Sequence, residues 1–550
     1  MVVDGVDNLV NTSIEFKVCR WLDETEFRDL LKFADYVGRN GKCSTFRFSP
    51  AKYKRNRLWK EYVVEALDRV GAELDEIARA RLETFFEEER SVYIYAAKGL
   101  GYVIRSHVYL ADILQEFREK GDVYYSKDHK GFIVKPYAII DVVKKLKLGG
   151  LRVVDESNLI TRRNAVDVEL KIALRDYQEE AIEAWIEHDG RGVIALPTGA
   201  GKTYIGIAAI ARLKLPTLVV VYTKEQLHQW LEKLLKTTTL NRSLIGLYYS
   251  EEKRIAPITI TTYQTAYRHV EVLSDKFSLL IVDEVHHLPA DKFRIIALKL
   301  LAPYRMGLSA TPYREDGRHE ELFRLMGGIV YYRMLQELQD RGYIAPYRII
   351  PVFVALRPSE AVEYQRLRKE YQRLASGRNV EELLRDSAVG DETAKKALSI
   401  LNSMKKLVAH SEAKIEAAKR IVEEELLRGS KILVFTQYLS QAEIVARKLG
   451  APLLSGATPR DKRKLVLEGF KRGHYKVLVM TTVGDEGIDI PDANVGVILS
   501  SSGSRRQFIQ RLGRLLRPKP GKEAKLYEII AKNTFEERYY KRLINVDILL

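Results

Sequence analysis

Leu196-Pro-Thr-Gly-Ala-Gly-Lys-Thr203 stands between the apolar run that begins at Val193 and the apolar stretch from Tyr204 to Leu213. A strand that runs through a glycine-containing loop into a helix is a setting in which phosphate binds, because backbone N–H groups and the positive end of the helix meet the anion together. The stretch therefore predicts a parallel α/β sheet with nucleotide phosphates at its edge.

The loop residues have separate expected roles. Gly199 and Gly201 allow a tight turn and a close approach of the backbone to phosphate. Lys202 is expected to reach the outer phosphates, and Thr203 to bind Mg²⁺. The predicted nucleotide-binding loop is completed by Thr198 and Ala200.

An acidic pair follows a second buried strand. Asp283 and Glu284 come directly after the apolar run 279–282, at the carboxyl edge where open α/β sheets bind ligands. We expect Asp283 to hold Mg²⁺ and Glu284 to activate the attacking water. His286 and His287 lack supporting cysteine ligands for zinc, so a role for His286 in coupling is favoured over a role in metal binding.

The order of the motifs along the chain adds specificity. Arg175 and Gln178 precede the phosphate loop by about one helix and are expected to read the adenine edge. Ser309-Ala-Thr311 follows the acidic pair, and Gln510-Arg-Leu-Gly-Arg-Leu-Leu-Arg517 lies far downstream. Ser309 and Thr311 are expected to couple the two halves of the chain. Glycosylases, kinases and dehydrogenases do not present this series.

The composition favours a polyanionic partner. Ninety Lys and Arg residues outnumber 74 Asp and Glu residues, for a net charge of +16. Such a balance is typical of nucleic-acid-binding proteins, although an evenly spread basic charge is the alternative. Cys19 and Cys43 are too few for a disulfide framework or a four-thiolate zinc site, so we expect reduced packing residues.

The chain carries no signal-peptide pattern at its beginning and no run of about 18 apolar residues. We therefore expect no membrane association and a cytosolic or nuclear location.

The alternation of β-branched runs with amphipathic segments predicts two tandem α/β domains, each with a buried parallel sheet. At about 150 residues per domain the chain holds three or four domains. The predicted boundaries are a small N-terminal α+β region at 1–165, a first α/β domain at 166–345, a helical insertion at 346–412 and a second α/β domain at 413–550.

Two regions leave their function open. In the insertion, Tyr364, Leu367, Tyr371 and Leu374 form an apolar helical stripe among basic residues, which fits either a nucleic-acid contact or a solvated connector. In the N-terminal region, the basic and aromatic stretch 46–57 fits either stacking on nucleic acid or a solvated edge. Runs 91–95 and 101–106 are predicted to pair as strands.

Residues 170–545 resemble the superfamily 2 helicases, whose RecA-like domains come in tandem. Leu196, in place of a glycine, is similar to the helicase form of the phosphate loop. The resemblance implies that Arg514 and Arg517 are arginine fingers, with Gln510 in the same motif. It also assigns Asp485 and Asp489 to the segment that links ATP to nucleic acid. The residues that the resemblance implies to contact one strand of the nucleic acid are Thr223, Lys224, Thr262, Gln264 and Thr481.

One element narrows the resemblance to helicases of the XPB type. Arg314, Glu315 and Asp316 follow Ser309-Ala-Thr311 as the Arg-Glu-Asp element does in that family, which implies a role in opening the duplex. The insertion at 355–410 then resembles the XPB thumb, and the N-terminal region stands where XPB proteins recognise damage.

The resemblance implies an ATP- and Mg²⁺-dependent 3′ to 5′ DNA helicase or translocase, acting on single-stranded or forked DNA in nucleotide excision repair or transcription. A monomeric motor of the archaeal type is favoured, with a nuclease or a repair or transcription protein as partner. The archaeal type implies the cytoplasm, and a eukaryotic one the nucleus. The alternatives are a superfamily 2 motor for RNA or branched DNA, and a DNA-binding scaffold with a vestigial ATPase.

Overall fold

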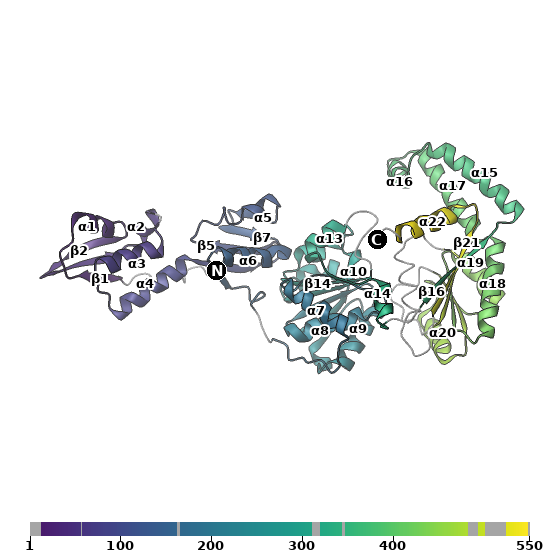
Figure 1. Ribbon diagram of the computed structural model, residues 1–550, viewed down its shortest axis with the longest axis horizontal. Coiled ribbons are helices and arrows are strands. Elements are labelled where there is room, and N and C mark those ends of the chain that lie inside the picture. Colours follow the sequence, from purple (N-terminus) through teal and green to yellow (C-terminus); the bar gives the residue numbers. More distant parts are fainter. Residues whose placement is uncertain are drawn as a thin grey trace. The chain divides into compact units, whose positions relative to one another are not determined.

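A computed structural model of the protein describes residues 13–56, 58–161, 165–310, 319–343, 347–481, 493–500 and 524–547. The chain divides into two compact units, Met1–Asn158 and Leu159–Leu550. Figure 1 gives the order of the helices and strands along the chain.

The first unit contains two separate sheets. The first sheet has the order β1-β3-β2 and the second the order β6-β7-β5-β4-β8. The strands are β1 (Glu15–Val18), β2 (Ala34–Asn40), β3 (Cys43–Phe48), β4 (Ser91–Ala97), β5 (Gly101–Ser106), β6 (Val123–Ser126), β7 (Gly131–Val134) and β8 (Arg152–Asp155). The helices are α1 (Glu24–Leu31), α2 (Pro50–Arg55), α3 (Lys60–Arg69), α4 (Glu76–Glu89), α5 (Gln115–Glu119), η1 (Pro136–Ala138) and α6 (Ile139–Leu148). The predicted pairing of β4 with β5 is confirmed.

Cys19 and Cys43 form a disulfide, so the expectation of reduced cysteines was wrong. The pairing of β1 with β3 explains the bond, because Val18 lies opposite Ser44 and the two cysteines are the next residues along. Their 24-residue separation in sequence gave no sign of this antiparallel register.

The second unit begins with a parallel sheet of order β11-β12-β10-β13-β14-β9-β15. Its strands are β9 (Arg191–Ala195), β10 (Thr217–Val221), β11 (Ile245–Tyr248), β12 (Ile258–Thr262), β13 (Leu279–Asp283), β14 (Tyr304–Ser309) and β15 (Ile329–Tyr332). Its helices are α7 (Asp176–Glu187), α8 (Lys202–Leu213), α9 (Lys224–Thr237), η2 (Arg242–Leu244), α10 (Tyr263–Arg268), α11 (Val270–Leu273), η3 (Val285–His287), α12 (Arg294–Lys299), α13 (His319–Met326) and α14 (Leu335–Asp340).

Strands β9, β10 and β13 are buried along their whole length. Strands with helices on both faces of the sheet read as continuous apolar runs, which is why the sequence pattern located them. Packing of α8 onto α9 requires Gly206, because a Cβ there would lie 2.5 Å from the Trp230 ring.

A second parallel sheet has the order β16-β21-β20-β17-β19-β18. Its strands are β16 (Tyr347–Val354), β17 (Ile432–Thr436), β18 (Leu453–Leu454), β19 (Val477–Thr481), β20 (Val495–Ile498) and β21 (Ala524–Ala531). Its helices are α18 (Glu412–Leu427), α19 (Leu439–Leu449), α20 (Arg460–Arg472) and α22 (Phe535–Asp547). The two sheets together confirm the predicted tandem α/β fold.

The predicted start of the insertion at residue 346 needs correction. Strand β16 lies in that range but pairs in parallel with β21 over its whole length, so it belongs to the second sheet. Three helices follow it: α15 (Pro358–Ala375), α16 (Val380–Ala388) and α17 (Glu392–Ala409). On α15, Tyr364 and Leu367 are buried against Met404 and Val408 of α17, as an inward apolar stripe predicts.

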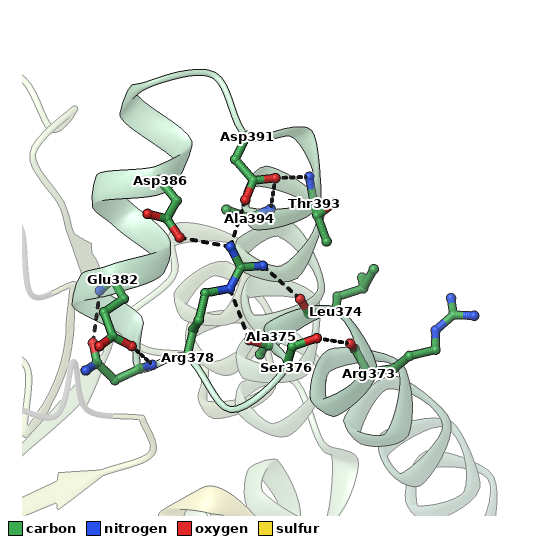
Figure 2. A network of polar contacts seen from close by, with 11 residues as sticks. Arg373, Leu374, Ala375, Ser376, Arg378, Glu382, Asp386, Asp391, Thr393 and Ala394 are labelled. Atoms are coloured by element: carbon green, nitrogen blue, oxygen red, sulfur yellow. Dashed lines mark hydrogen bonds and ion pairs between the residues drawn. The ribbon is translucent and has the colours of Figure 1, made fainter.

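Arg378 organises the turn between α15 and α16 (Figure 2). Its guanidinium donates to Asp386 at 2.8 Å and Asp391 at 2.7 Å, and to two carbonyls at the end of α15. Asp391 in turn caps α17 by accepting from the Thr393 N–H at 2.7 Å. One side chain therefore joins the three helices of the insertion.

Glu425 on α18 is a buried carboxylate that joins α18 to β21. It accepts hydrogen bonds from Tyr527 at 2.8 Å, Lys525 at 3.1 Å and Ser430 at 2.9 Å, and it also pairs with Arg428. Burial alone would raise the pKa of Glu425, but these four donors outweigh it and lower the pKa to about 2.

Glu425→Gln is expected to remove a pH-dependent part of the stability. A carboxyl whose pKa is lower in the folded state stabilises the fold above its ordinary pKa and loses that effect as the pH falls towards 2. The free energy of unfolding at pH 7, measured by denaturant titration, should fall by about 2 kcal/mol or more. Its decline between pH 4.5 and 2.5 should also become shallower. Equal slopes for Glu425→Gln and the exposed control Glu424→Gln would contradict this assignment.

None of the helices in the described part of the chain is long and apolar enough to cross a membrane.

Candidate nucleotide and nucleic-acid site

The phosphate loop leaves the carboxyl end of β9, where the Leu196 N–H donates to the Ser309 carbonyl at 3.0 Å. Gly199 has φ +90° and Gly201 has φ +77°. Gly201 is also the N-cap of α8, and a Cβ there would lie 2.6 Å from the Gln178 amide nitrogen. Both glycines are therefore required by the backbone conformation, and Gly201 is also required by a close neighbour.

Lys202 is the first residue of α8. Its ammonium donates to the carbonyl of Leu196 at 3.0 Å and to that of Pro197 at 3.4 Å. Burial lowers the pKa of Lys202, and the carboxylates of Glu284 and Asp283 act in the opposite direction. The cation therefore lies between the loop carbonyls and the acidic pair.

Two hydroxyl groups of the loop are placed for polar ligands. Thr198 Oγ1 is buried and has no hydrogen-bond partner among the described residues, as expected for a group that pairs with a bound anion. Thr203 Oγ1 accepts from Lys233 of α9 at 3.1 Å. Sequence reasoning missed Lys233, which no local motif marks.

Asp283 ends β13 and is almost buried, with 9% of its surface exposed. Its carboxylate accepts from Trp230 Nε1 at 2.8 Å and from the Glu284 N–H at 3.0 Å. Glu284 has φ +50°, a conformation that costs free energy for a residue with a Cβ and is typical of functional sites. Trp230 was also missed, because it lies 53 residues before Asp283.

His286 connects the acidic pair with the next strand. It is completely buried, and its Nδ1 lies 3.0 Å from Ser309 Oγ and 3.4 Å from Glu284 Oε2. The neighbouring His287 ring stacks on Tyr222 at 4.0 Å. A continuous set of contacts therefore runs from Glu284 to the strand end that precedes Thr223.

The predicted adenine-reading residues lie beside the loop. Gln178 accepts from the Arg175 N–H at 3.0 Å and donates to the Ala200 carbonyl at 3.1 Å. Arg175 donates to the Tyr343 carbonyl at 3.1 Å, and its guanidinium lies 5.7 Å from the Tyr343 ring. Tyr343 is a further residue that the motifs did not identify.

The residues that the family resemblance assigns to contact with a nucleic-acid strand differ in exposure. Thr223 and Thr262 are helix N-caps, of α9 and α10, and Thr262 is buried. Gln264 is exposed, whereas Lys224 pairs with Glu251 at 2.7 Å. Thr481 is buried at the end of β19, opposite Thr436 of β17. The hydroxyls of the two N-caps therefore stabilise helix ends, and Gln264 faces solvent.

Several predicted residues lie outside the described residues: Thr311, Arg314, Glu315, Asp316, Asp485, Asp489, Gln510, Arg514 and Arg517.

Within the described ranges, no group of three or more His, Cys, Asp and Glu residues is arranged to hold a metal ion. Mg²⁺ in nucleotide sites is usually bound by one or two protein groups together with phosphate oxygens and water. Thr203, which follows Lys202 in the chain, and Asp283, whose charge acts on Lys202, are a donor set of that kind.

Comparisons with known proteins agree on the two halves of the second unit. Residues 171–314 match the family of the type III restriction enzyme res subunit, and residues 390–545 match the ERCC3/RAD25/XPB C-terminal helicase family.

Three relatives bear XPB in their names. The DNA 3′-5′ translocase XPB2 of Sulfurisphaera tokodaii is 38% identical over 400 residues, which cover 70% of this chain and 89% of that protein. The DNA 3′-5′ helicase XPB of Kineococcus radiotolerans is 34% identical and matches 67% of this chain and 61% of its own length. The general transcription and DNA repair factor IIH subunit XPB/SSL2 of Saccharomyces cerevisiae is 30% identical, over 69% of this chain and 44% of that protein.

The helicase domain of Pyrococcus furiosus Hef is similar in structure, with a TM-score of 0.46 and 23% identity, over 67% of this chain and 98% of that one. The XPB relatives and the matched C-terminal helicase family decide the assignment: the chain belongs to the XPB family of superfamily 2 helicases.

Proposed function

We propose that the protein is an ATP-driven DNA motor that moves 3′ to 5′ and opens or translocates on DNA in repair or transcription. The observation that carries this proposal is the contact of His286 with both Glu284 and Ser309 at the carboxyl edge of the first sheet, where the charges of Glu284 and Asp283 also act on Lys202. The names of the XPB relatives supply the polarity and the DNA substrate.

ATP would bind at the N-terminus of α8. Lys202 would exchange the carbonyls of Leu196 and Pro197 for the outer phosphate oxygens, and the Thr198 hydroxyl would gain a partner. Thr203 and Asp283 would hold Mg²⁺, which neutralises developing charge on the phosphates. Gln178 and Arg175 would bind the adenine.

Glu284 would orient the attacking water and take up its proton. Because His286 contacts both Glu284 and Ser309, a change in the charge or position of Glu284 would be transmitted through His286 to Ser309, and from there to Thr311. Gln510, Arg514 and Arg517 would complete the site by supplying cations to the transferring phosphoryl group. Asp485 and Asp489 would connect the nucleotide with the strand bound near Thr481.

The α17 helix offers a surface for the DNA backbone. An open groove of about 420 Å³ is lined by Ser387 of α16 and by one face of α17. Apart from Leu398, the α17 residues that line it are polar or basic: Lys395, Ser399, Asn402, Ser403 and Lys406. Hydroxyl, amide and ammonium donors on successive helical turns suit phosphate oxygens. The basic side predicted for α15 is partly neutralised, since Arg366 pairs with Glu363. In the groove, Lys395 likewise pairs with the exposed Glu392 at 2.6 Å, a contact that a phosphate oxygen would replace, whereas Lys406 has no ion pair in the described part of the chain.

Lys395→Ala combined with Lys406→Ala is expected to weaken binding to forked DNA equally for all sequences. Each lost phosphate contact should lower the salt slope of log K by about 1. Fluorescence anisotropy between 50 and 200 mM salt measures both effects. Arg373→Ala combined with Arg385→Ala, two exposed cations that do not line the groove, is the charge-matched control, and a slope like that of the groove variant in this control would contradict the groove assignment.

The remaining roles extend the proposal. Arg314, Glu315 and Asp316 would act at the strand junction, and residues 1–165 would recognise DNA or damage. A nuclease or a repair or transcription protein would be the partner of a monomeric motor, in the cytoplasm for an archaeal-type protein and in the nucleus for a eukaryotic one.

Displacement of streptavidin from biotinylated single strands tests the polarity. A 3′ to 5′ motor frees streptavidin from the 5′ end in the presence of ATP and leaves the 3′ end blocked. Release from the 3′ end alone would contradict the proposed direction, and the Lys202→Ala variant supplies the ATP-independent background.

A further inference from the structure

A cavity of about 370 Å³ lies at the carboxyl end of the second sheet. In this sheet, β18 and β19 lie on one side of β17, and β20 and β21 lie on its other side. The direction in which successive strands are added therefore reverses between β17 and β20. Gln437 follows β17 and Ser500 follows β20, and both line the cavity. Open α/β sheets bind ligands at such a reversal.

The walls of the cavity come from two helices. Helix α17 contributes Lys405 and Ala409, one turn apart, and α22 contributes Phe535, Arg538 and Tyr539. The Phe535 N–H donates to Tyr364 of α15 at 2.9 Å, which holds α22 against the insertion. The cavity is thus built where the helical insertion meets the second sheet.

Two residues that line the cavity, Gln437 and Ser500, are joined by a hydrogen bond. The Gln437 N–H donates to Ser500 Oγ at 2.8 Å, and Ser500 Oγ donates to Gln441 Oε1 at 2.6 Å. Gln441 is completely buried. These hydrogen bonds join the ends of β17 and β20 on the cavity wall, as in a largely preformed pocket.

The charges favour an anion at one end. No ion pair of Lys405 or Arg538 occurs in the described part of the chain. The carboxylate of Glu536 is neutralised by Lys414, which donates to both of its oxygens at 2.7 Å. Two cations therefore remain available for phosphate oxygens.

The other lining groups favour a nucleobase. Phe535 and Tyr539 lie one helical turn apart, and aromatic side chains bind unstacked bases without regard to sequence. Glu528 also lines the cavity. A volume of 370 Å³ is near the lower end for ligand pockets, which suits one nucleotide.

We propose that this cavity holds one nucleotide of the DNA strand, with its phosphate at Lys405 and Arg538 and its base beside Phe535 and Tyr539. This inference rests on the proposed DNA motor. Gripping one nucleotide there would tie the strand to both the insertion and the second sheet, away from the phosphate loop that binds ATP.

Photocrosslinking tests the site. Forked DNA with 5-iodouracil at successive single-stranded positions is irradiated with the full-length protein, and crosslinked peptides are mapped by mass spectrometry. One position should crosslink to the α22 peptide that contains residues 535–539. Lys405→Ala with Arg538→Ala should lower the yield about tenfold. Lys532→Ala, an exposed cation beside α22 that does not line the cavity, should leave it unchanged.

Tyr539→Leu is a second variant that keeps apolar bulk, removes the ring and should also lower the yield. A yield that neither the double variant nor Tyr539→Leu lowers would overturn the proposal. So would labelling of α22 by 8-azido-ATP without DNA, which would assign the cavity to a free nucleotide.

The ATPase rate of the same samples separates this inference from the motor itself. If DNA stimulates the ATPase while α22 gives no crosslink, the cavity assignment fails and the motor stands. If DNA does not stimulate the wild-type ATPase, the proposed motor fails first.

Discussion

Lys202→Ala is expected to lower DNA-stimulated ATP hydrolysis by about a hundredfold or more, the largest effect we predict for any single substitution. The ammonium of Lys202 is a partly buried cation that donates to the Leu196 carbonyl and feels the charges of the acidic pair. Alanine supplies neither a positive charge nor a hydrogen-bond donor to phosphate. A steady-state ATPase assay with saturating forked DNA measures the loss.

The fold is expected to survive this change. Burial already disfavours the charged form of Lys202, so a neutral side chain removes a desolvation cost along with the hydrogen bonds to Leu196 and Pro197. Arg212→Ala, an exposed position on the same helix α8, is the control and should retain the wild-type rate. Hydrolysis by Lys202→Ala at a rate near that of the control would contradict the assignment of the loop.

Glu284→Gln is expected to lower hydrolysis by about a hundredfold while ATP and DNA still bind. Glutamine keeps the shape and an acceptor oxygen beside His286, but its amide does not take up a proton from water. Isothermal titration with ATP and single-turnover hydrolysis measure the two effects separately. This pattern differs from that of Lys202→Ala, which should weaken ATP binding as well.

Glu187→Gln, an exposed carboxylate at the end of α7, is the matched control for charge. If Glu284→Gln hydrolysed ATP as fast as Glu187→Gln, another group would have to activate the water. If Glu284→Gln lost ATP binding altogether, its role would be structural, through the contact with His286.

The parts of the fold that the sequence predicted are those encoded locally. The run that ends at Ala195 became a wholly buried strand, and the next loop led directly into α8. The acidic pair was predicted at a strand end and lies there, because a continuous apolar run followed by two carboxylates is a local pattern. The paired strands β4 and β5 were found in the same way.

What sequence reasoning missed depends on contacts between distant residues. Trp230 donates to Asp283 across 53 residues, and Arg175 donates to Tyr343 across 168. Strand β16 looked like the start of the insertion because its partner β21 lies at the other end of the domain. The disulfide depended on the register of β1 with β3. None of these contacts leaves a periodic or local signal in the chain.

The most direct test of the DNA motor is the ATPase rate of the purified protein with single-stranded DNA, forked DNA or RNA of matched length. We expect strong stimulation by both DNA forms, little by RNA, and none in the Lys202→Ala variant. Stimulation by RNA alone would contradict a DNA motor of the XPB type, and full biological activity of Lys202→Ala would leave only a DNA-binding scaffold.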